Sequence, residues 1–205
     1  KMISSYKEMR FYIKADAIMC GFDNIPFKKR IFHPNKRKEF LRVLRITEWL
    51  SNCKWKHPWM WIPYLFYSRK YEKLSYICGY SIPYNVLGYG TNLAHHGSCV
   101  INGANPIGNY CAIMNNLCIA NEHPKKIGNG IYFATNVVIA KKTNIANGVK
   151  ISANSLVNKS IEKENTLYGG TPAIYLKDTE PWYYEQPWYD RYRRCEELRI
   201  KKRIQ

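Results

Sequence analysis

Hydrophobic residues recur at every sixth position through residues 127–160. The register runs without a slip through Ile127, Phe133, Ile139, Ile145, Ile151 and Val157. A second set lies two residues before the last five members: Ile131, Val137, Thr143, Val149 and Ser155. Two inward side chains separated by one outward residue follow the period of a pleated strand. The pattern therefore predicts short strands, each followed by a bend.

Stacked six-residue units predict a parallel β-solenoid. An α-helix would need apolar residues three and four positions apart, and a hairpin sheet would need regularly spaced clusters of turn residues. Neither pattern is present. The six-residue register also occurs upstream at Ile101, Ile107, Ile113 and Ile119, and less regularly at Leu87 and Leu93. Stacking these units would bury one continuous apolar column.

Two insertions interrupt the register, and both contain histidine. Leu93 and Ile101 are eight residues apart, as are Ile119 and Ile127. The first insertion holds His95 and His96, and the second holds His123. Imidazole titrates near neutral pH and can accept a proton from a hydroxyl group. These histidines are therefore candidate catalytic bases.

The residues that flank the repeat predict helices. We expect an α-helical region over residues 1–78, the solenoid over 79–177 and an aromatic, basic tail over 178–205. In the helix expected at 36–50, one face is apolar and basic residues are expected to point to solvent. The apolar residues are Phe40, Leu41, Val43, Leu44 and Leu50, and the basic ones are Lys38, Arg42 and Arg45.

The tail contains Pro-Trp-Tyr twice, at 181–183 and 187–189, before a basic helix expected at 190–204. We interpret these aromatic residues as packing against the solenoid or the N-terminal helices. Stacking on a sugar ring is the alternative. The earlier aromatic stretch 55–67 is too short and too interrupted by proline to span a bilayer. We favour its burial at a subunit contact, with peripheral membrane contact as the alternative.

Charge and cysteine content narrow the classes of function. The chain has 32 Lys and Arg against 15 Asp and Glu, a formal net charge of +17. No nucleic-acid-binding motif accompanies this charge, so we expect no nucleic-acid partner. Seven cysteines without a CxxC pair disfavour both a disulfide framework and a zinc site. With no secretory segment at the start, we expect a cytoplasmic protein, with the inner face of the membrane as an alternative location.

Three further segments, together with the repeat, resemble the hexapeptide-repeat acyltransferases. They are Ala94–Ser98, Glu122–Gly128 and Asn165–Ala173. The resemblance covers about half of the chain and is closest to the serine acetyltransferase-like branch, which includes enzymes of bacterial polysaccharide biosynthesis. It implies a left-handed parallel β-helix, a homotrimer and direct acetyl transfer from acetyl-CoA to a hydroxyl. No metal is expected.

The resemblance also assigns roles to individual residues. It implies that His95 is the general base, with His96 as its competitor. His123 is implied at the acceptor site, and a core histidine is the alternative for it. The residues implied to contact acetyl-CoA are Ala134, Thr135, Ser152 and Ala153, with Lys159 and Lys177 near its phosphates. Those implied on the acceptor side are Ser81, Asn121 and Glu122.

Three departures from the family pattern bear on the acceptor. Ala94 and Glu122 stand where serine acetyltransferases have an aspartate and an arginine, and Ser81 is the nearest counterpart of a second aspartate. A site without that arginine should bind the carboxylate of serine poorly. We therefore predict a saccharide acceptor, with serine O-acetylation as the alternative. A non-catalytic trimeric scaffold that binds a membrane surface or a polyanion is the alternative of another class.

Overall fold

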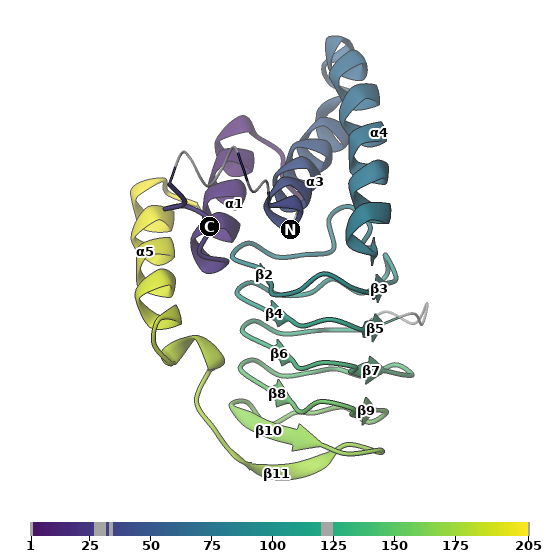
Figure 1. Ribbon diagram of the computed structural model, residues 1–205, viewed down its shortest axis with the longest axis vertical. Coiled ribbons are helices and arrows are strands. Elements are labelled where there is room, and N and C mark those ends of the chain that lie inside the picture. Colours follow the sequence, from purple (N-terminus) through teal and green to yellow (C-terminus); the bar gives the residue numbers. More distant parts are fainter. Residues whose placement is uncertain (1, 27–31, 33–34, 120–124, 205) are drawn as a thin grey trace.

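The computed structural model describes residues 2–26, 32, 35–119 and 125–204. In this part of the chain, three of the α-helices lie at one end of a stack of coils, and another runs beside the stack back towards the first (Figure 1). The helices are α1 (Tyr6–Met19), α3 (Lys36–Cys53), α4 (Trp61–Cys78) and α5 (Trp188–Lys201), with short 3-10 helices η1 (Pro58–Met60) and η2 (Trp182–Tyr184).

The coils form a three-sided parallel solenoid. One face is the sheet β1-β3-β5-β7-β9 and a second is β11-β10-β8-β6-β4-β2, in which β11 is antiparallel to β10. Single parallel bridges along the third face join Leu87, Ile107, Ile127, Ile145 and Ile161 in turn. The strands are β1 (Tyr80–Ser81), β2 (Asn92–Leu93), β3 (Cys99–Ile101), β4 (Ala112–Ile113), β5 (Leu117–Ile119), β6 (Tyr132–Phe133), β7 (Val138–Ile139), β8 (Lys150–Ile151), β9 (Leu156–Val157), β10 (Thr166–Gly169) and β11 (Ile174–Asp178).

Burial confirms the six-residue register. Every member from Ile127 to Val157 is at most 5% exposed, and the second inward set from Ile131 to Ser155 is at most 2% exposed. The insertions do not shift the register, because Leu93 pairs with Ile113 across the first and Ile113 pairs with Phe133 across the second. The first insertion forms a longer corner that carries His95 and His96, whereas 120–124 of the second lie outside the described residues.

The expected helices are present, with bounds that differ by a few residues. Asn35 caps the start of α3, and its side chain accepts a hydrogen bond from the Lys38 backbone. Gly79 ends α4 in the left-handed region, at φ 76°, and turns the chain into β1. Phe40 on α3 and Leu74 on α4 belong to the same buried cluster as the first coil. One hydrophobic core therefore continues from the helices into the solenoid.

Arg45 is buried, so the expectation that it points to solvent is wrong. Its Nε donates to Asp16 Oδ2 at 2.8 Å and its NH1 to Glu48 Oε2 at 3.1 Å. It also donates to the carbonyl oxygens of Leu87 and Gly88, at 2.8 and 2.6 Å. A prediction from hydrophobic periodicity assigns every basic residue of a helix to the solvent-exposed face. It cannot detect a carboxylate from another segment that would pair with a buried basic residue.

The two carboxylates of this cluster also bind the first coil. The Thr91 backbone N–H donates to Asp16 Oδ1 at 3.0 Å, and the Asn85 backbone N–H donates to Glu48 Oε1 at 2.8 Å. Burial raises the pKa of Asp16 and of Glu48, and the attraction of Arg45 opposes that rise. The cluster therefore joins α1, α3 and the start of the solenoid through buried charges.

The tail packs back on the solenoid and on α1, which agrees with the favoured interpretation of its aromatic residues. Trp182 donates through Nε1 to the Tyr110 carbonyl at 2.9 Å. Lys150 on β8 pairs with Glu185 at 2.9 Å, and Arg191 on α5 donates to the Met19 carbonyl at 3.1 Å. Residues of η2 and α5 thus share a buried cluster with α1.

Replacing Arg45 by Met should destabilise the fold by about 3–5 kcal/mol, because two buried carboxylates would lose their cation. Urea unfolding followed by circular dichroism measures this free energy. Arg42→Met is the matched control: Arg42 is exposed on the same helix, so its loss should cost less than about 0.5 kcal/mol. Equal stability of the two variants would contradict the role given to the buried cluster.

Candidate functional site

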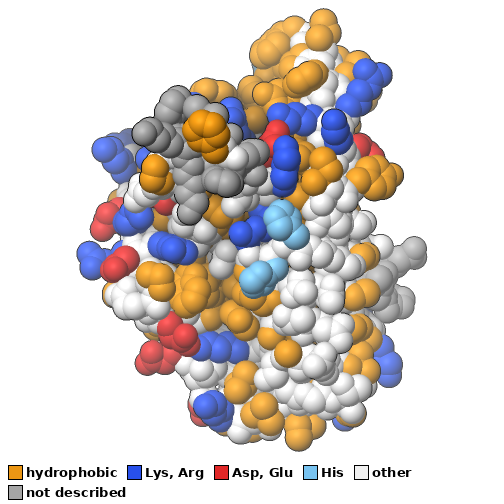
Figure 2. All heavy atoms as spheres, viewed as in Figure 1, with side chains coloured by type: hydrophobic (Ala, Val, Ile, Leu, Met, Phe, Trp, Pro, Cys, Tyr) orange, Lys and Arg blue, Asp and Glu red, His pale blue; other side chains and the backbone are white. Residues whose placement is uncertain are grey.

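His95 lies at an exposed corner of the solenoid, two residues after β2 ends. His96 follows it and is also exposed. Figure 2 shows two histidines near the centre of one face, next to a hydrophobic surface and below a group of basic side chains. The first insertion therefore presents an imidazole pair to solvent instead of burying it in the core.

The same corner recurs once per coil, and the longer corner of the first coil carries His95 at one end of the row. Strands β2, β4, β6 and β8 pair in register, so that Leu93, Ile113, Phe133 and Ile151 are stacked. Two positions after the last three lie Asn115, Thr135 and Ala153, which follow one another along the solenoid axis. In the first coil Gly97 lies against Asn115, so the insertion sets His95 beside the end of this row. With strands about 4.8 Å apart, Thr135 is two strand spacings, roughly 10 Å, from the first coil along the axis. Ala134 and Ser152 belong to the adjacent line, next to Ala94.

The backbone before His95 is held by side chains from the helical region and from β1. Arg37 on α3 donates to the Leu93 carbonyl at 2.9 Å and also to the Ala94 carbonyl. Tyr80 on β1 donates through its hydroxyl to the His95 carbonyl at 2.6 Å. Three consecutive carbonyl groups thus have donors, which fixes the start of the longer corner.

Arg37 also influences the charge of the imidazole pair. Partial burial lowers the pKa of His96, and the charge of Arg37 lowers it further, as does repulsion between the two imidazoles of the pair. A lower pKa increases the neutral fraction of His96 at neutral pH, which is the form that can accept a proton. The corner is therefore suited to a base.

A cavity of about 430 Å³ adjoins His95, between the β2-β4-β6-β8 face and the tail. The solenoid contributes Asn92, Ala94, Met114, Tyr132 and Lys150 to its wall. The tail contributes two tryptophans, Trp182 and Trp188, and one carboxylate, Glu185. The rings of Trp182 and Trp188 meet edge to face at 5.8 Å. The cavity thus combines a candidate base with aromatic walls.

The polar groups of this cavity differ in how they are paired. Asn92 is only 8% exposed, and its side-chain amide makes no hydrogen bond within the part of the chain that the structure describes. Lys150 and Glu185 pair with each other at 2.9 Å. Asn92 is therefore the buried polar side chain that an occupant of the cavity would satisfy.

Several predicted site residues lie elsewhere. Ser81 is exposed on β1 and lines a separate hollow of about 410 Å³ with Tyr76 and Pro83. Lys159 follows β9 in the other sheet, and Lys177 lies on the terminal strand β11. The predicted residues Asn121, Glu122 and His123 lie outside the described residues. Their roles stay predictions.

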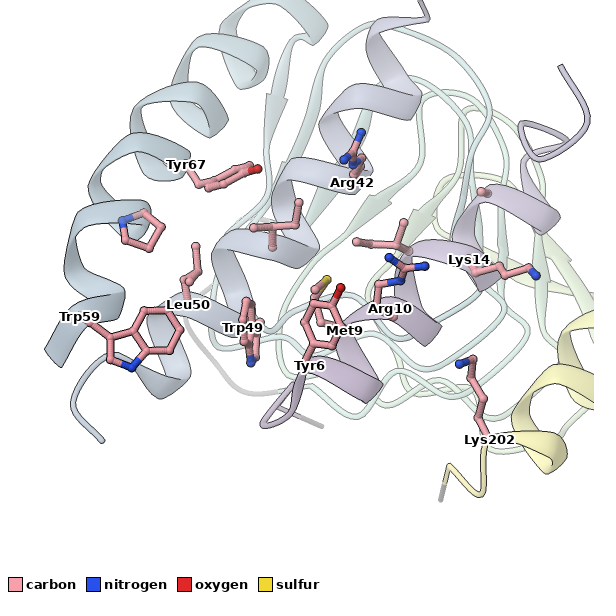
Figure 3. A pocket seen from close by; sticks show the side chains of 14 residues that line it. Tyr6, Met9, Arg10, Lys14, Arg42, Trp49, Leu50, Trp59, Tyr67 and Lys202 are labelled. Carbon is pink, nitrogen blue, oxygen red and sulfur yellow. The ribbon is translucent and has the colours of Figure 1, made fainter. Parts of the chain in front are cut away.

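A larger cavity, of about 660 Å³, lies among α1, α3 and the start of α4. Figure 3 shows basic side chains around it from three different parts of the chain: Arg10 and Lys14 on α1, Arg42 on α3 and Lys202 just after α5. Trp49 and Trp59 lie at its other end. No residue predicted for catalysis lines this cavity.

The described residues contain no group of three or more His, Cys, Asp or Glu that could hold a metal ion. The seven cysteines are all free thiols. Burial raises the pKa of Cys111 to about 12 and that of Cys99 to about 12. These two thiols are therefore core side chains and not nucleophiles.

Sequence reasoning missed Arg37, Tyr80 and Asn92 as neighbours of the candidate base. Arg37 precedes Leu93 by 56 residues and reaches it only because α3 packs across the first coil. No local motif signals such a contact. Asn92 stands directly before the inward Leu93, at an outward position where polar residues such as Lys150 are ordinary, so its residue type gave no signal.

Comparison with known structures identifies the fold. A serine acetyltransferase from Brucella abortus strain S19 has a TM-score of 0.65 at 20% identity, over 85% of this chain and 71% of that chain. One from Neisseria gonorrhoeae has a TM-score of 0.63 at 19% identity, over 86% and 71%. A serine acetyltransferase in complex with CoA has a TM-score of 0.60 at 16% identity, over 83% and 71%.

These likenesses show that the chain has the left-handed parallel β-helix fold, with N-terminal helices and a C-terminal helix, as the sequence predicted. No family model matches the sequence, and no curated protein matches it either. At these identities the structures establish the fold, and the chemistry of the site has to be argued from its own residues.

Replacing Arg37 by Met should raise the pKa of His96, because a cation that disfavours the protonated imidazole would be removed. An NMR titration of the histidine ring protons measures the change. Arg42→Met removes a cation from the same helix at an exposed position and should leave the pKa of His96 unchanged. A pKa of His96 that does not respond to Arg37→Met would contradict the electrostatic coupling.

Proposed function

We propose that the protein is an acetyl-CoA-dependent O-acetyltransferase with His95 as its general base and His96 as the competing candidate. The observation that carries this proposal is the exposed imidazole of His95 at the end of a row of corners that hold Thr135 and Ala153. The small side chains of these corners support an approach of acetyl-CoA towards His95. The same fold in a serine acetyltransferase that binds CoA supports the proposal.

The chemistry requires one base and no covalent intermediate. His95 accepts the proton of the acceptor hydroxyl while the oxygen attacks the carbonyl carbon of the thioester. The tetrahedral intermediate then collapses, the carbon–sulfur bond breaks, and the leaving thiolate takes the proton from the imidazolium. The products are the acetyl ester and free CoA.

The residues along the corner suit a narrow pantetheine chain. Ala134, Ser152 and Ala153 have short side chains, so that an extended amide chain can approach the backbone there. Thr135 holds its hydroxyl near Asn115, to whose Oδ1 it donates at 2.9 Å. Lys159 and Lys177 are exposed and lie towards the last coils, where they would meet phosphates that leave the groove.

Two acceptors remain, and different observations favour them. L-Serine is favoured by the structural comparisons, because the similar proteins are serine acetyltransferases. A saccharide is favoured by the cavity beside His95, where Trp188 and Tyr132 offer apolar ring faces and Asn92 offers an unpaired amide. Sugars present apolar C–H faces together with hydroxyls, which this combination matches. The comparisons give serine the stronger support.

A homotrimer is part of the proposal. His95 is exposed in a single chain, whereas acyl transfer benefits from a site that excludes water. A neighbouring copy packed against this face would cover the imidazole and complete the groove. Gel filtration with light scattering determines the number of copies.

His95→Ala should lower the rate of acetyl transfer by about 10²–10⁴, which is the usual contribution of a general base. CoA release detected with a thiol reagent measures this rate with L-serine, monosaccharides and nucleotide sugars as acceptors. His57→Ala, which removes an exposed histidine from η1's N-cap position, should leave the rate unchanged. If the rate is unchanged in His95→Ala but falls strongly in His96→Ala, the general base is His96.

If neither wild type nor variants release CoA with any acceptor of the panel, the scaffold alternative replaces the proposal. If L-serine is the only compound of the panel that is acetylated, the acceptor is L-serine, as the comparisons favour.

Trp188→Ala should raise KM for a saccharide acceptor roughly tenfold, because the sugar ring would lose an aromatic face. KM for L-serine should not change, since serine has no apolar ring face to stack. Tyr189→Ala is the matched control, because Tyr189 is an exposed neighbour that does not line the cavity. Equal KM values for the saccharide in wild type and Trp188→Ala would show that the cavity does not bind the acceptor.

A further inference from the structure

The start of α4 and the segment before it expose large apolar side chains. Trp55, Trp59, Ile62 and Phe66 are 77%, 64%, 79% and 65% exposed, and Leu65 is 49% exposed. Such side chains are usually at least half covered in a soluble domain, and a contiguous apolar patch marks a contact surface. We call the surface formed by Trp55, Trp59, Ile62, Leu65 and Phe66 the apolar tip.

The apolar tip is at the end of the molecule that is farthest from the solenoid. α4 ends at Cys78, where the chain enters the first coil, so its first residues project away from the coils (Figure 1). Figure 2 shows hydrophobic side chains gathered on this projection, with basic side chains directly below them. Among the described residues no helix is long and apolar enough to cross a membrane.

Basic residues continue the same face of α4 behind the apolar tip. Arg69 and Lys73 follow Ile62 and Phe66 at helical spacings of three and four. Both are exposed, and neither has an ion-pair partner within the described part of the chain. With a rise of about 1.5 Å per residue, Arg69 lies roughly 10 Å along the helix from Ile62.

The cavities on the two sides of α4 are also basic. One is lined by Arg10, Lys14, Arg42 and Lys202, next to Trp59. The other is lined by Arg69, Lys73, Lys36 and Lys70, next to Ile62 and Phe66. Among described residues, Glu39 is the only carboxylate in either lining, and Lys70 and Lys36 already pair with it at 2.8 and 3.1 Å.

The base of the apolar tip is held rigid by a buried cation. Lys54 is 9% exposed, and its ammonium lies 4.5 Å from the ring centre of Trp61 and 3.5 Å from that of Tyr64. These cation–π contacts fix the turn that connects α3 to α4. The exposed apolar side chains therefore sit on a defined structure.

We propose that the apolar tip docks on the surface of a lipid bilayer that contains anionic headgroups. Tryptophan, phenylalanine and isoleucine enter the interface between headgroups and acyl chains, where buried apolar side chains reach about 5–10 Å deep. Arg69 and Lys73 then lie at the level of the phosphates. The role is independent of the acetyl transfer proposed above.

Charge complementarity favours a bilayer over a second copy of the chain. A symmetric contact through this face would bring the basic excess of one copy close to that of the other. Among described residues of α4, Glu72 is the one carboxylate against Arg69, Lys70 and Lys73, and Glu39 on α3 already pairs with Lys36 and Lys70. Anionic lipid neutralises that excess, and each basic residue near such a surface strengthens the binding.

Co-sedimentation of the full chain with vesicles tests the proposal. We expect binding to phosphatidylcholine vesicles that contain phosphatidylglycerol, weak binding to pure phosphatidylcholine, and a decrease as salt is raised. Ile62→Ser with Phe66→Ser should lower the partition coefficient roughly tenfold or more. Arg69→Gln with Lys73→Gln should lower it roughly tenfold for anionic vesicles only.

Matched controls distinguish vesicle binding by the apolar tip from non-specific adsorption of the protein to vesicles. Ile200→Ser removes a side chain that is 67% exposed on α5, and Lys142→Gln with Lys201→Gln removes the same number of exposed charges; both should bind like wild type. Equal loss in controls and tip variants, or no vesicle binding by wild type, would overturn the proposal. So would light scattering that shows wild type as a larger assembly than Ile62→Ser with Phe66→Ser, because the occupant would then be a second copy.

Discussion

The buried guanidinium of Arg45 fixes how the helices meet the solenoid. It is bonded to Asp16 on α1, to Glu48 on its own helix and to two carbonyl groups of the first coil. Removing charges from water is unfavourable unless each is paired and hydrogen-bonded, so this arrangement tolerates little displacement. Arg37 is eight residues earlier on α3, or about 12 Å along the helix. The anchor at Arg45 thus determines where Arg37 meets the corner that carries His95.

The regular repeat of the coils makes the positions of the other candidate site residues, Thr135 and Ala153, predictable from the sequence. In a parallel solenoid without register shifts, equivalent corners repeat at the strand spacing of about 4.8 Å. Asn115, Thr135 and Ala153 are therefore aligned by the repeat itself, and the first insertion lengthens the corner that carries His95 beside them. A catalytic group on an extended corner can protrude from the line while the groove behind it stays continuous. The residues that stabilise the fold are therefore different from those of the candidate site: the inward residues form the core, and the corner residues can vary without disturbing it.

Features that depend on local periodicity could be predicted from the sequence. Features that depend on packing between distant segments could not. The six-residue register, the inward positions of Phe133 and Val149, and the apolar face of α3 follow from spacing alone. The burial of Arg45 does not, because Asp16 and the carbonyl groups of Leu87 and Gly88 reach it only when α1 and the first coil pack against α3. The same holds for Arg37 beside His95. The packing of the tail aromatics on the solenoid or the helices was predicted, but the cavity lined by Trp182 and Trp188 was not, because it depends on where the tail meets the β2-β4-β6-β8 face.

The exposure of His95 sets a requirement on the assembly. An imidazole surrounded by water gains little from nearby dipoles, because water screens them, whereas a covered site strengthens each electrostatic contact. In the single chain, the tail covers one side of His95 with Trp182 and Trp188, and the opposite side stays open. In the proposed acetyl transfer, the tail would form one side of the site, and the acceptor would have to be held from the opposite side. A second copy that supplies this side would place the cleft between chains, and the base would then be desolvated only in the assembled protein.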